Sequence, residues 1–270
     1  MIRVVTPAAW AVSVPRVVAG FAPPGTVTLE RLADPRTLER VAFEVGRALG
    51  TDRRAAVLTV VHFAVGAITA VLAAPLVLDG VALEARPDQL GVVLRDGELA
   101  GFWVAEAREG SGARPMVRLG AIASVLLAPI ASAVRSVERI GLRGLDNVML
   151  DALAAGIRRH ERMAGREPDP ALVEQLVLGA GREGYRPARP LSVHVDAGPA
   201  VTFHVPATCC VLATEVTPGA CPTCPMRADD TARRIAIIDW VDGMDDPAFR
   251  EVCGRDPVRP GHRSPVEPAP

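Results

Sequence analysis

The sequence predicts an α+β protein that is mostly helical, with a small β-hairpin or sheet and a four-cysteine segment near its C-terminus. Hydrophobic residues make up 49% of the 270 residues and aromatic residues only 4%, so the core must be built from aliphatic side chains. Such a core suits packed helices better than a β-sandwich, whose strands usually alternate aromatic and β-branched residues. Helix start and stop signals flank one short region of strand-like runs, and four of the five cysteines lie close together.

The length allows one large domain or two modest ones. We expect an irregular N-terminal segment (1–34), then a helical domain (35–190) with an inserted β-hairpin (79–106). A C-terminal segment that carries the cysteines (191–253) follows. The Pro-rich tail (254–270) is expected to be disordered because it has too few apolar residues to pack.

The first helix is predicted from its boundaries. Asp34 is a suitable N-cap and Pro35 suits the first helical position. The helix should end near Leu49, and Thr51 or Asp52 would cap the next one.

The apolar run 55–78 carries no charge and is long enough to span a bilayer. It contains His62 and Pro75, however, and it is rich in Ala, which inserts into membranes only marginally. We therefore expect a buried helix, or two short ones, with His62 as a core residue hydrogen-bonded to backbone. A membrane span is the alternative.

Strand-like pieces at 81–84, 91–94 and 99–104 follow, and Asp96-Gly97 between two apolar runs predicts a hairpin turn. Helical patterning then returns at 117–139, 145–165 and 170–180. We expect a kink or break at Pro129, a cap at Asp146 or Asn147, and a helix start at Asp169-Pro170. Residues 186–206 should be strand or coil, followed by a short structured piece at 234–241.

The net charge of −1 gives no general attraction to nucleic acid or to anionic lipid. Short apolar steps near the N-terminus are broken by Pro7 and Pro15, which is unlike a secretion signal. We therefore expect a cytoplasmic protein. Clustered cysteines in that compartment indicate metal or redox chemistry rather than structural disulfides.

The cysteines form a compact pattern in which Cys209-Cys210 is followed by ten residues and then by Cys221-x-x-Cys224. Thiolates are the usual ligands of [2Fe–2S] clusters, and a Cys-x-x-Cys turn lets two sulfurs reach one metal. The turn residues at 218–219 can bring the two pairs together. Adjacent cysteines point to opposite faces of a regular strand, and zinc ribbons normally use two Cys-x-x-Cys knuckles. The pattern favours iron–sulfur, with structural zinc as the leading alternative.

The CC-x10-C-x2-C pattern resembles the signature of the ferric siderophore reductase family of the FhuF type, which has a C-terminal [2Fe–2S] segment. The stretch 141–153 is similar to the family's Leu-Trp-Gly-Asn-Ala motif, with Asn147 at the Asn position. The order of elements across 36–230 also fits. The sequence departs from the family in three places. Ala207-Thr208 replaces the usual Arg-Arg before the cysteine pair, Val211-Leu212 follows it where the family has a Tyr, and Leu145-Asp146 replaces Trp-Gly.

This resemblance implies an enzyme, an iron–sulfur oxidoreductase that reduces ferric iron bound to a siderophore and releases Fe(II) in the cytoplasm. Its cofactor would be a [2Fe–2S] cluster held by Cys209, Cys210, Cys221 and Cys224. No Gly-rich nucleotide motif follows a strand, so the electron donor should be a separate ferredoxin or flavoprotein. Peripheral association with the inner face of the membrane is compatible with this role. The alternative function is a non-redox siderophore-binding or scaffold protein with a structural zinc site on the same cysteines.

The remaining polar and aromatic residues receive ordinary structural interpretations. Cys253 is expected to be a free thiol, and a substitute ligand is the alternative. The basic runs 158–160 and 233–234 are expected on solvated helix faces, and Trp103 and Trp240 in the core. No catalytic residue beyond the four thiolates is identified.

Overall fold

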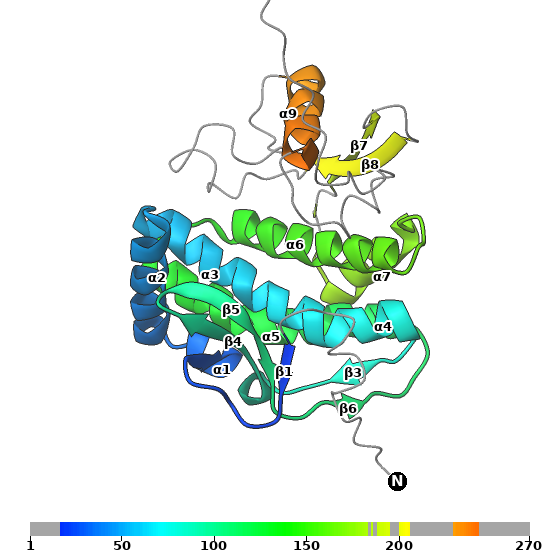
Figure 1. The fold of residues 1–270 in the computed structure, drawn as a ribbon. Coiled ribbons are helices and arrows are strands. Elements are labelled where there is room, and N and C mark those ends of the chain that lie inside the picture. The colour runs from blue at the N-terminus through cyan, green and yellow to red at the C-terminus, as the bar shows by residue number, and fades with distance from the viewer. Residues whose placement is uncertain (1–16, 183–184, 186–187, 195–199, 206–228, 243–270) are drawn as a thin grey trace, which may run out of the picture.

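The computed structural model describes residues 17–182, 185, 188–194, 200–205 and 229–242, which form a helical body and a smaller C-terminal unit (Figure 1). The predicted class, α+β and mostly helical, is confirmed.

The boundaries of the first long helix agree with the prediction. Helix α1 (Leu29–Leu32) leads into α2 (Pro35–Leu49), where the Asp34 carboxylate accepts a hydrogen bond from the Thr37 amide at 2.9 Å. Gly50 ends α2 in the left-handed conformation, and Asp52 caps the next helix.

The apolar run forms one long helical rod made of α3 (Arg53–Ile68), the π-helix η1 (Thr69–Ala73) and α4 (Ala74–Asp79). The rod and α5 (Pro115–Val137) are long and apolar enough to cross a membrane, a test that core helices of soluble proteins also meet. The expected burial of the rod is confirmed, since 83% of its most apolar 18-residue stretch is buried inside the protein. His62 differs from the expectation: its Nε2 is enclosed but has no hydrogen-bond partner in the described part of the chain, and burial lowers its pKa.

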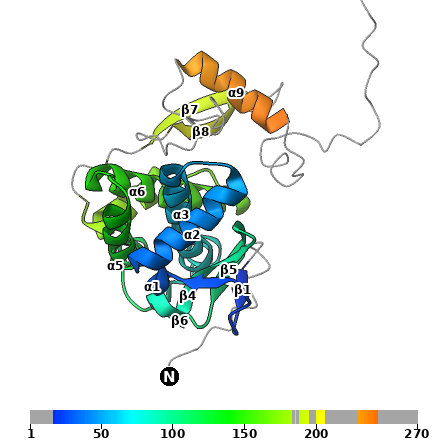
Figure 2. The ribbon, with the colours of Figure 1, turned by 90° about the vertical axis from the view of Figure 1, so that its left-hand side faces the viewer.

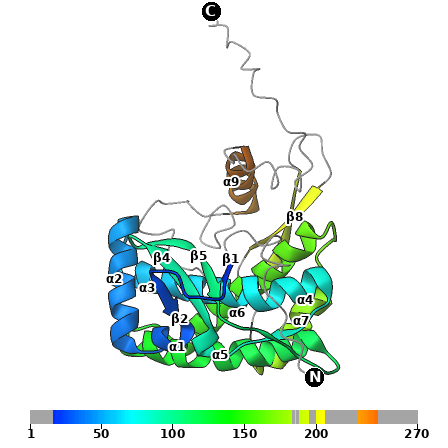
Figure 3. The same ribbon diagram turned by 60° about the horizontal axis from the view of Figure 1, so that its bottom comes forward.

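A four-stranded sheet lies against α3 (Figure 3). Its order is β1-β5-β4-β2, with bounds β1 Val17–Ala19, β2 Thr26–Thr28, β4 Leu90–Arg95 and β5 Glu98–Val104. The predicted β4–β5 hairpin is confirmed, and both Asp96 and Gly97 have positive φ. Strands β1 and β2 pair with this hairpin, although they belong to the N-terminal segment (1–34) that was expected to be irregular. Trp103 is buried as expected, and its Nε1 donates to the Gly20 carbonyl at 2.9 Å.

Three shorter elements follow, and Figure 1 shows the two strands among them, β3 and β6, beside the sheet at the lower right of the body. Strands β3 (Leu83–Glu84) and β6 (Arg108–Glu109) pair antiparallel, and the 3-10 helix η2 (Pro87–Gln89) connects β3 to β4.

The second half of the body consists of α5, α6 (Leu142–Met163) and α7 (Pro170–Ala180). Helix α5 continues through Pro129 without a break. The predicted cap of α6 is wrong, because the helix begins after Gly141 and both Asp146 and Asn147 lie inside it. Leu145, fully buried, places the first turns of α6 in the core, so the helix starts one turn earlier than the polar residues suggested. Asp169 caps α7 as predicted.

The C-terminal unit combines the antiparallel pair β7 (Arg189–His194) and β8 (Ala200–Val205) with α9 (Asp230–Asp242). It has its own small apolar cluster, made of Leu191, Val193, Phe203, Val205 and Ile237. Figures 1 and 2 both show this unit on the side of α6 that faces away from the rest of the body. The Pro-rich tail lies outside the described residues.

Candidate functional site

The predicted ligands Cys209, Cys210, Cys221 and Cys224 lie outside the described residues, as does Cys253. The iron–sulfur cluster and its zinc alternative therefore stay predictions. Among the residues that the structure does describe, no group of three or more His, Cys, Asp or Glu side chains could hold a metal ion.

The residues that flank the cysteine segment are held together within the C-terminal unit. Val205, the last residue of β8, pairs with Arg189 at the start of β7. The Arg189 guanidinium forms two hydrogen bonds with the carboxylate of Asp230, one of them 2.9 Å long. Asp230 opens α9, and its hydrogen bonds with Arg189 and Arg233 lower the pKa of its carboxyl to about 2. The chain therefore enters and leaves the cysteine segment at one corner of the unit.

This corner is within reach of all four thiols. Cys210 follows Val205 by five residues and Cys224 precedes Asp229 by five residues. Five residues of extended chain reach at most about 17 Å. The lengths of chain on both sides thus allow the two cysteine pairs to meet beside the corner.

Helix α6 carries most of the buried polar residues in the described part of the chain. Of nine such residues, five lie on this helix: Asn147, Asp151, Arg158, His160 and Glu161. Burying polar groups opposes folding unless they are paired, so their concentration on one helix calls for an explanation. The expectation that 158–160 forms a solvated face is wrong for Arg158 and His160, and only Arg159 is exposed. In the second basic run Arg233 is likewise buried.

Two of these residues fix α6 against the body. The His160 imidazole is hydrogen-bonded to the backbone of Thr69 in the π-helix η1, and burial lowers the imidazole pKa to about 4. At Gly156 the helices approach so closely that an added Cβ would lie 2.0 Å from Cγ2 of Thr69. The side of α6 that bears His160 and Gly156 therefore faces the core.

Asn147, Asp151 and Arg158 lie on the other side of α6. With 3.6 residues per turn they project within about 40° of one another and roughly 140–180° from His160. Their exposed fractions are only 9%, 9% and 6%, although this side of the helix faces away from the body. We call these three residues, together with Tyr185, the α6 polar face.

The chain that leads from α7 to the C-terminal unit crosses this helix. Arg182 forms an ion pair with Asp146 at 3.3 Å, and the Tyr185 hydroxyl donates to Oδ1 of Asp151 at 2.8 Å. Figures 1 and 2 place the C-terminal unit over α6. The α6 polar face is thus positioned between the helical body and the unit that bears the cysteine segment.

The surroundings of the α6 polar face determine the protonation states of Tyr185 and Arg158. Burial and the negative charge of Asp151 raise the pKa of Tyr185 well above its usual range. Burial lowers the pKa of Arg158 and the negative charge of Asp151 opposes this shift, and a guanidinium remains charged at neutral pH. Within the described residues no hydrogen bond holds the Arg158 guanidinium. The face therefore offers a fixed positive charge and a neutral phenol, and neither group exchanges protons near pH 7.

Sequence reasoning identified Asn147 and missed the rest of the polar face. A usable signal was present, because Asn147, Asp151 and Arg158 recur at spacings of four and seven in an Ala- and Leu-rich helix. Tyr185 is also the one tyrosine of the chain.

Comparison with known proteins adds no identification. No protein-family model matches this sequence, and no curated protein matches it.

Proposed function

We propose that this protein is a cytoplasmic [2Fe–2S] oxidoreductase that reduces ferric iron bound to a siderophore. The observation that supports this proposal most directly is the cysteine pattern CC-x10-C-x2-C, whose four soft thiolate donors suit an iron–sulfur cluster. Cys209, Cys210, Cys221 and Cys224 would hold the cluster, which supplies one-electron transfer when bound.

The arrangement of the described residues supports this proposal. The ion pair of Arg189 with Asp230 keeps the two ends of the cysteine segment at one corner, which lowers the entropy lost when four thiols converge. On the α6 polar face, Arg158 and Tyr185 keep their protons near pH 7. Such a surface suits the transfer of an electron better than acid–base catalysis, which needs a group that titrates near the working pH.

The reaction is balanced by one electron for each iron. Fe(III) in the chelate is reduced to Fe(II), and the hard oxygen donors of a siderophore bind Fe(II) far less tightly, so the metal is released. The electron comes from a separate ferredoxin or flavoprotein.

Metal analysis after anaerobic purification tests the cofactor. We expect equal amounts of iron and acid-labile sulfide, about two of each per chain, and an EPR signal after one-electron reduction. Cys209→Ser and Cys221→Ser should lose both iron and sulfide, whereas the matched control Cys253→Ser should keep them. One zinc per chain and no sulfide would refute the redox function and favour the zinc-site alternative.

Stopped-flow spectroscopy tests the substrate. Adding a ferric hydroxamate or a ferric catecholate to the reduced protein should restore the visible absorption of the oxidised cluster and produce Fe(II) that a ferrous chelator traps. Reoxidation no faster than in buffer alone, in a protein that retains its iron and sulfide, would contradict reductase activity while leaving the cluster assignment intact.

A further inference from the structure

A groove with an arginine rim lies on the underside of the helical body. It has a volume of about 540 Å³, within the range of roughly 300–1,000 Å³ that small-molecule sites occupy. Its rim includes Arg86 before η2, Arg108 of β6 and Arg118 of α5, and Ile122 and Val125 of α5 form an apolar wall. We call this site the arginine groove.

The three guanidinium groups are each paired with a carboxylate. Asp88 accepts hydrogen bonds from both Nε and Nη2 of Arg86 at 3.0 Å, and Glu106 accepts one from Nε of Arg108 at 3.3 Å. Arg118 is paired with Glu84. These pairs are exposed to solvent, so they restrict the orientations of the guanidinium groups only in part.

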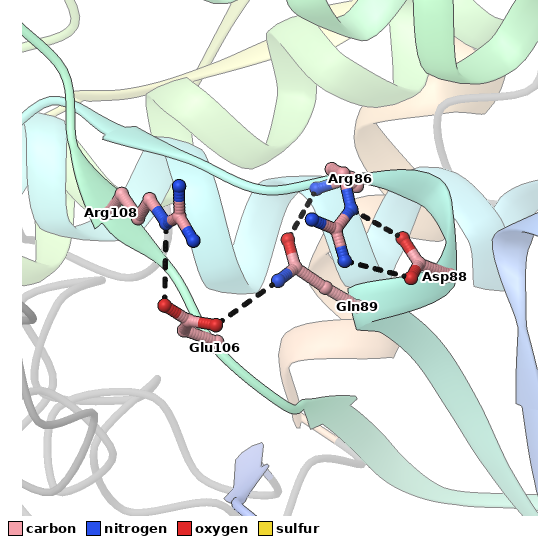
Figure 4. A network of polar contacts seen from close by, with 5 residues as sticks. All are labelled: Arg86, Asp88, Gln89, Glu106 and Arg108. Carbon is pink, nitrogen blue, oxygen red and sulfur yellow. Dashed lines mark hydrogen bonds and ion pairs between the residues drawn. The ribbon is translucent and has the colours of Figure 1, made fainter.

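Gln89 ties the two halves of the rim together. The residue is 8% exposed, its Oε1 accepts from the Arg86 amide at 2.9 Å, and its Nε2 donates to Glu106 at 3.4 Å. Figure 4 shows the side chains of Arg86 and Arg108 on either side of Gln89, with the terminal nitrogens of Arg108 turned toward it. No hydrogen bond within the described residues uses either terminal nitrogen of Arg108.

The apolar wall is open. Val125 is 70% exposed, although the next residue, Leu126, is well buried. An exposed aliphatic surface beside N–H donors matches a ligand with an apolar body and an anionic head.

The charge balance favours a head with a single negative charge. Glu84, Asp88 and Glu106 offset the three arginines, so a multiply charged anion would be repelled by the carboxylates. The paired N–H groups of a guanidinium match the two oxygens of a carboxylate. We propose that the arginine groove binds a small amphipathic monocarboxylate, with its carboxylate at Arg108 and Arg86 and its apolar body on Val125.

This inference is independent of the proposed function. The groove is lined by β3, η2, β6 and α5, and Figures 1 and 2 show β6 on the side of the body opposite the C-terminal unit. The ligand is therefore a second molecule and not the electron acceptor.

Isothermal titration with 1-naphthoate and with decanoate tests the proposal, each compared with its uncharged amide. We expect saturable binding of at least one acid and about tenfold weaker binding of its amide, because the amide lacks the charge-assisted contacts. Arg108→Gln and Val125→Asp should each weaken binding of the acid about tenfold or more. The matched control Arg95→Gln, an exposed arginine of β4 outside the groove, should leave it unchanged.

Both substituted side chains are exposed, so these variants should fold, which circular dichroism would verify. The proposal is overturned by any of three results. The first is that neither acid binds, and the second is that an acid and its amide bind equally. The third is that Arg108→Gln and Val125→Asp bind the acid as the wild type does.

Discussion

Replacing Gly156 with Ala tests the close packing that positions α6. The added Cβ would lie 2.0 Å from Cγ2 of Thr69 and 3.1 Å from its Cβ and Oγ1. Ordinary contact begins near 3.4 Å, so one helix must move or the Thr69 side chain must rotate. Thr69 cannot rotate freely, because it is β-branched, it is buried, and its hydroxyl donates to the Val65 carbonyl at 2.8 Å.

The magnitude follows from two opposing effects. Overpacking a well-packed core costs about 1–3 kcal/mol. Alanine in place of glycine inside a helix gains about 1 kcal/mol. Because this clash is severe, we place the overpacking near or above the upper end of that range and expect Gly156→Ala to lose about 2 kcal/mol of unfolding free energy.

Gly144→Ala provides a matched control on the same helix. No heavy atom lies within 4 Å of a Cβ at Gly144, so helix propensity alone should act and the variant should gain up to about 1 kcal/mol. Urea unfolding followed by circular dichroism measures both variants. In addition, Thr69→Ser removes Cγ2 and keeps the hydroxyl, so it should relieve much of the loss when combined with Gly156→Ala. If Gly156→Ala were as stable as the wild type, or if Thr69→Ser gave no relief, the inferred contact would be wrong.

Two further predictions concern polar residues on α6 and in the chain that crosses it. Tyr185→Phe removes the hydroxyl that donates to Asp151 and should cost about 1–2 kcal/mol in urea unfolding; an unchanged midpoint would contradict the packing of Tyr185 on α6. Burial lowers the pKa of His160 from 6.5 to about 4. As the pH falls, His160 therefore binds a proton near pH 6.5 in the unfolded chain but only near pH 4 in the folded chain. The stability from this residue is complete above pH 6.5 and declines between pH 6.5 and 4, by about 2–3 kcal/mol at pH 4.5. His160→Gln should remove that part of the pH dependence, and a variant that loses stability with acid as steeply as the wild type would refute the assignment.

The sequence predicted the elements whose signals are local. Asp34 and Gly50 mark the two ends of α2, and Asp96-Gly97 marks the turn of the β4–β5 hairpin. These signals are reliable because the residues act on their own backbone, through a capping hydrogen bond or a positive φ. No distant part of the chain is needed to interpret them.

Features that depend on distant contacts were not predictable in this way. Strand β1 pairs in parallel with β5, some 85 residues further along the chain, and no property of its three residues specifies that partner. Arg158 lies in a basic run that is typical of a solvated helix face. It is buried because the chain after α7 crosses α6, a contact formed by Tyr185 that hydrophobic periodicity does not reveal.

For the candidate site, the sequence specifies the donor atoms and the structure shows how the two ends of the cysteine segment come together. Spacing specifies the donor atoms, but it does not explain how pairs separated by ten residues meet. The described flanks supply that part, since β8 ends beside Arg189 and Arg189 binds Asp230 at the start of α9. Closing a chain of the 24 residues between Val205 and Asp230 into a loop costs about 3 kcal/mol in chain entropy. The apolar cluster around Ile237 and the ion pair of Asp230 with Arg189 offset this loss of entropy when the C-terminal unit folds. If the four thiols hold a cluster as we propose, they would need to fix only short stretches of chain, and the compact pattern of four cysteines would be enough to supply the ligands.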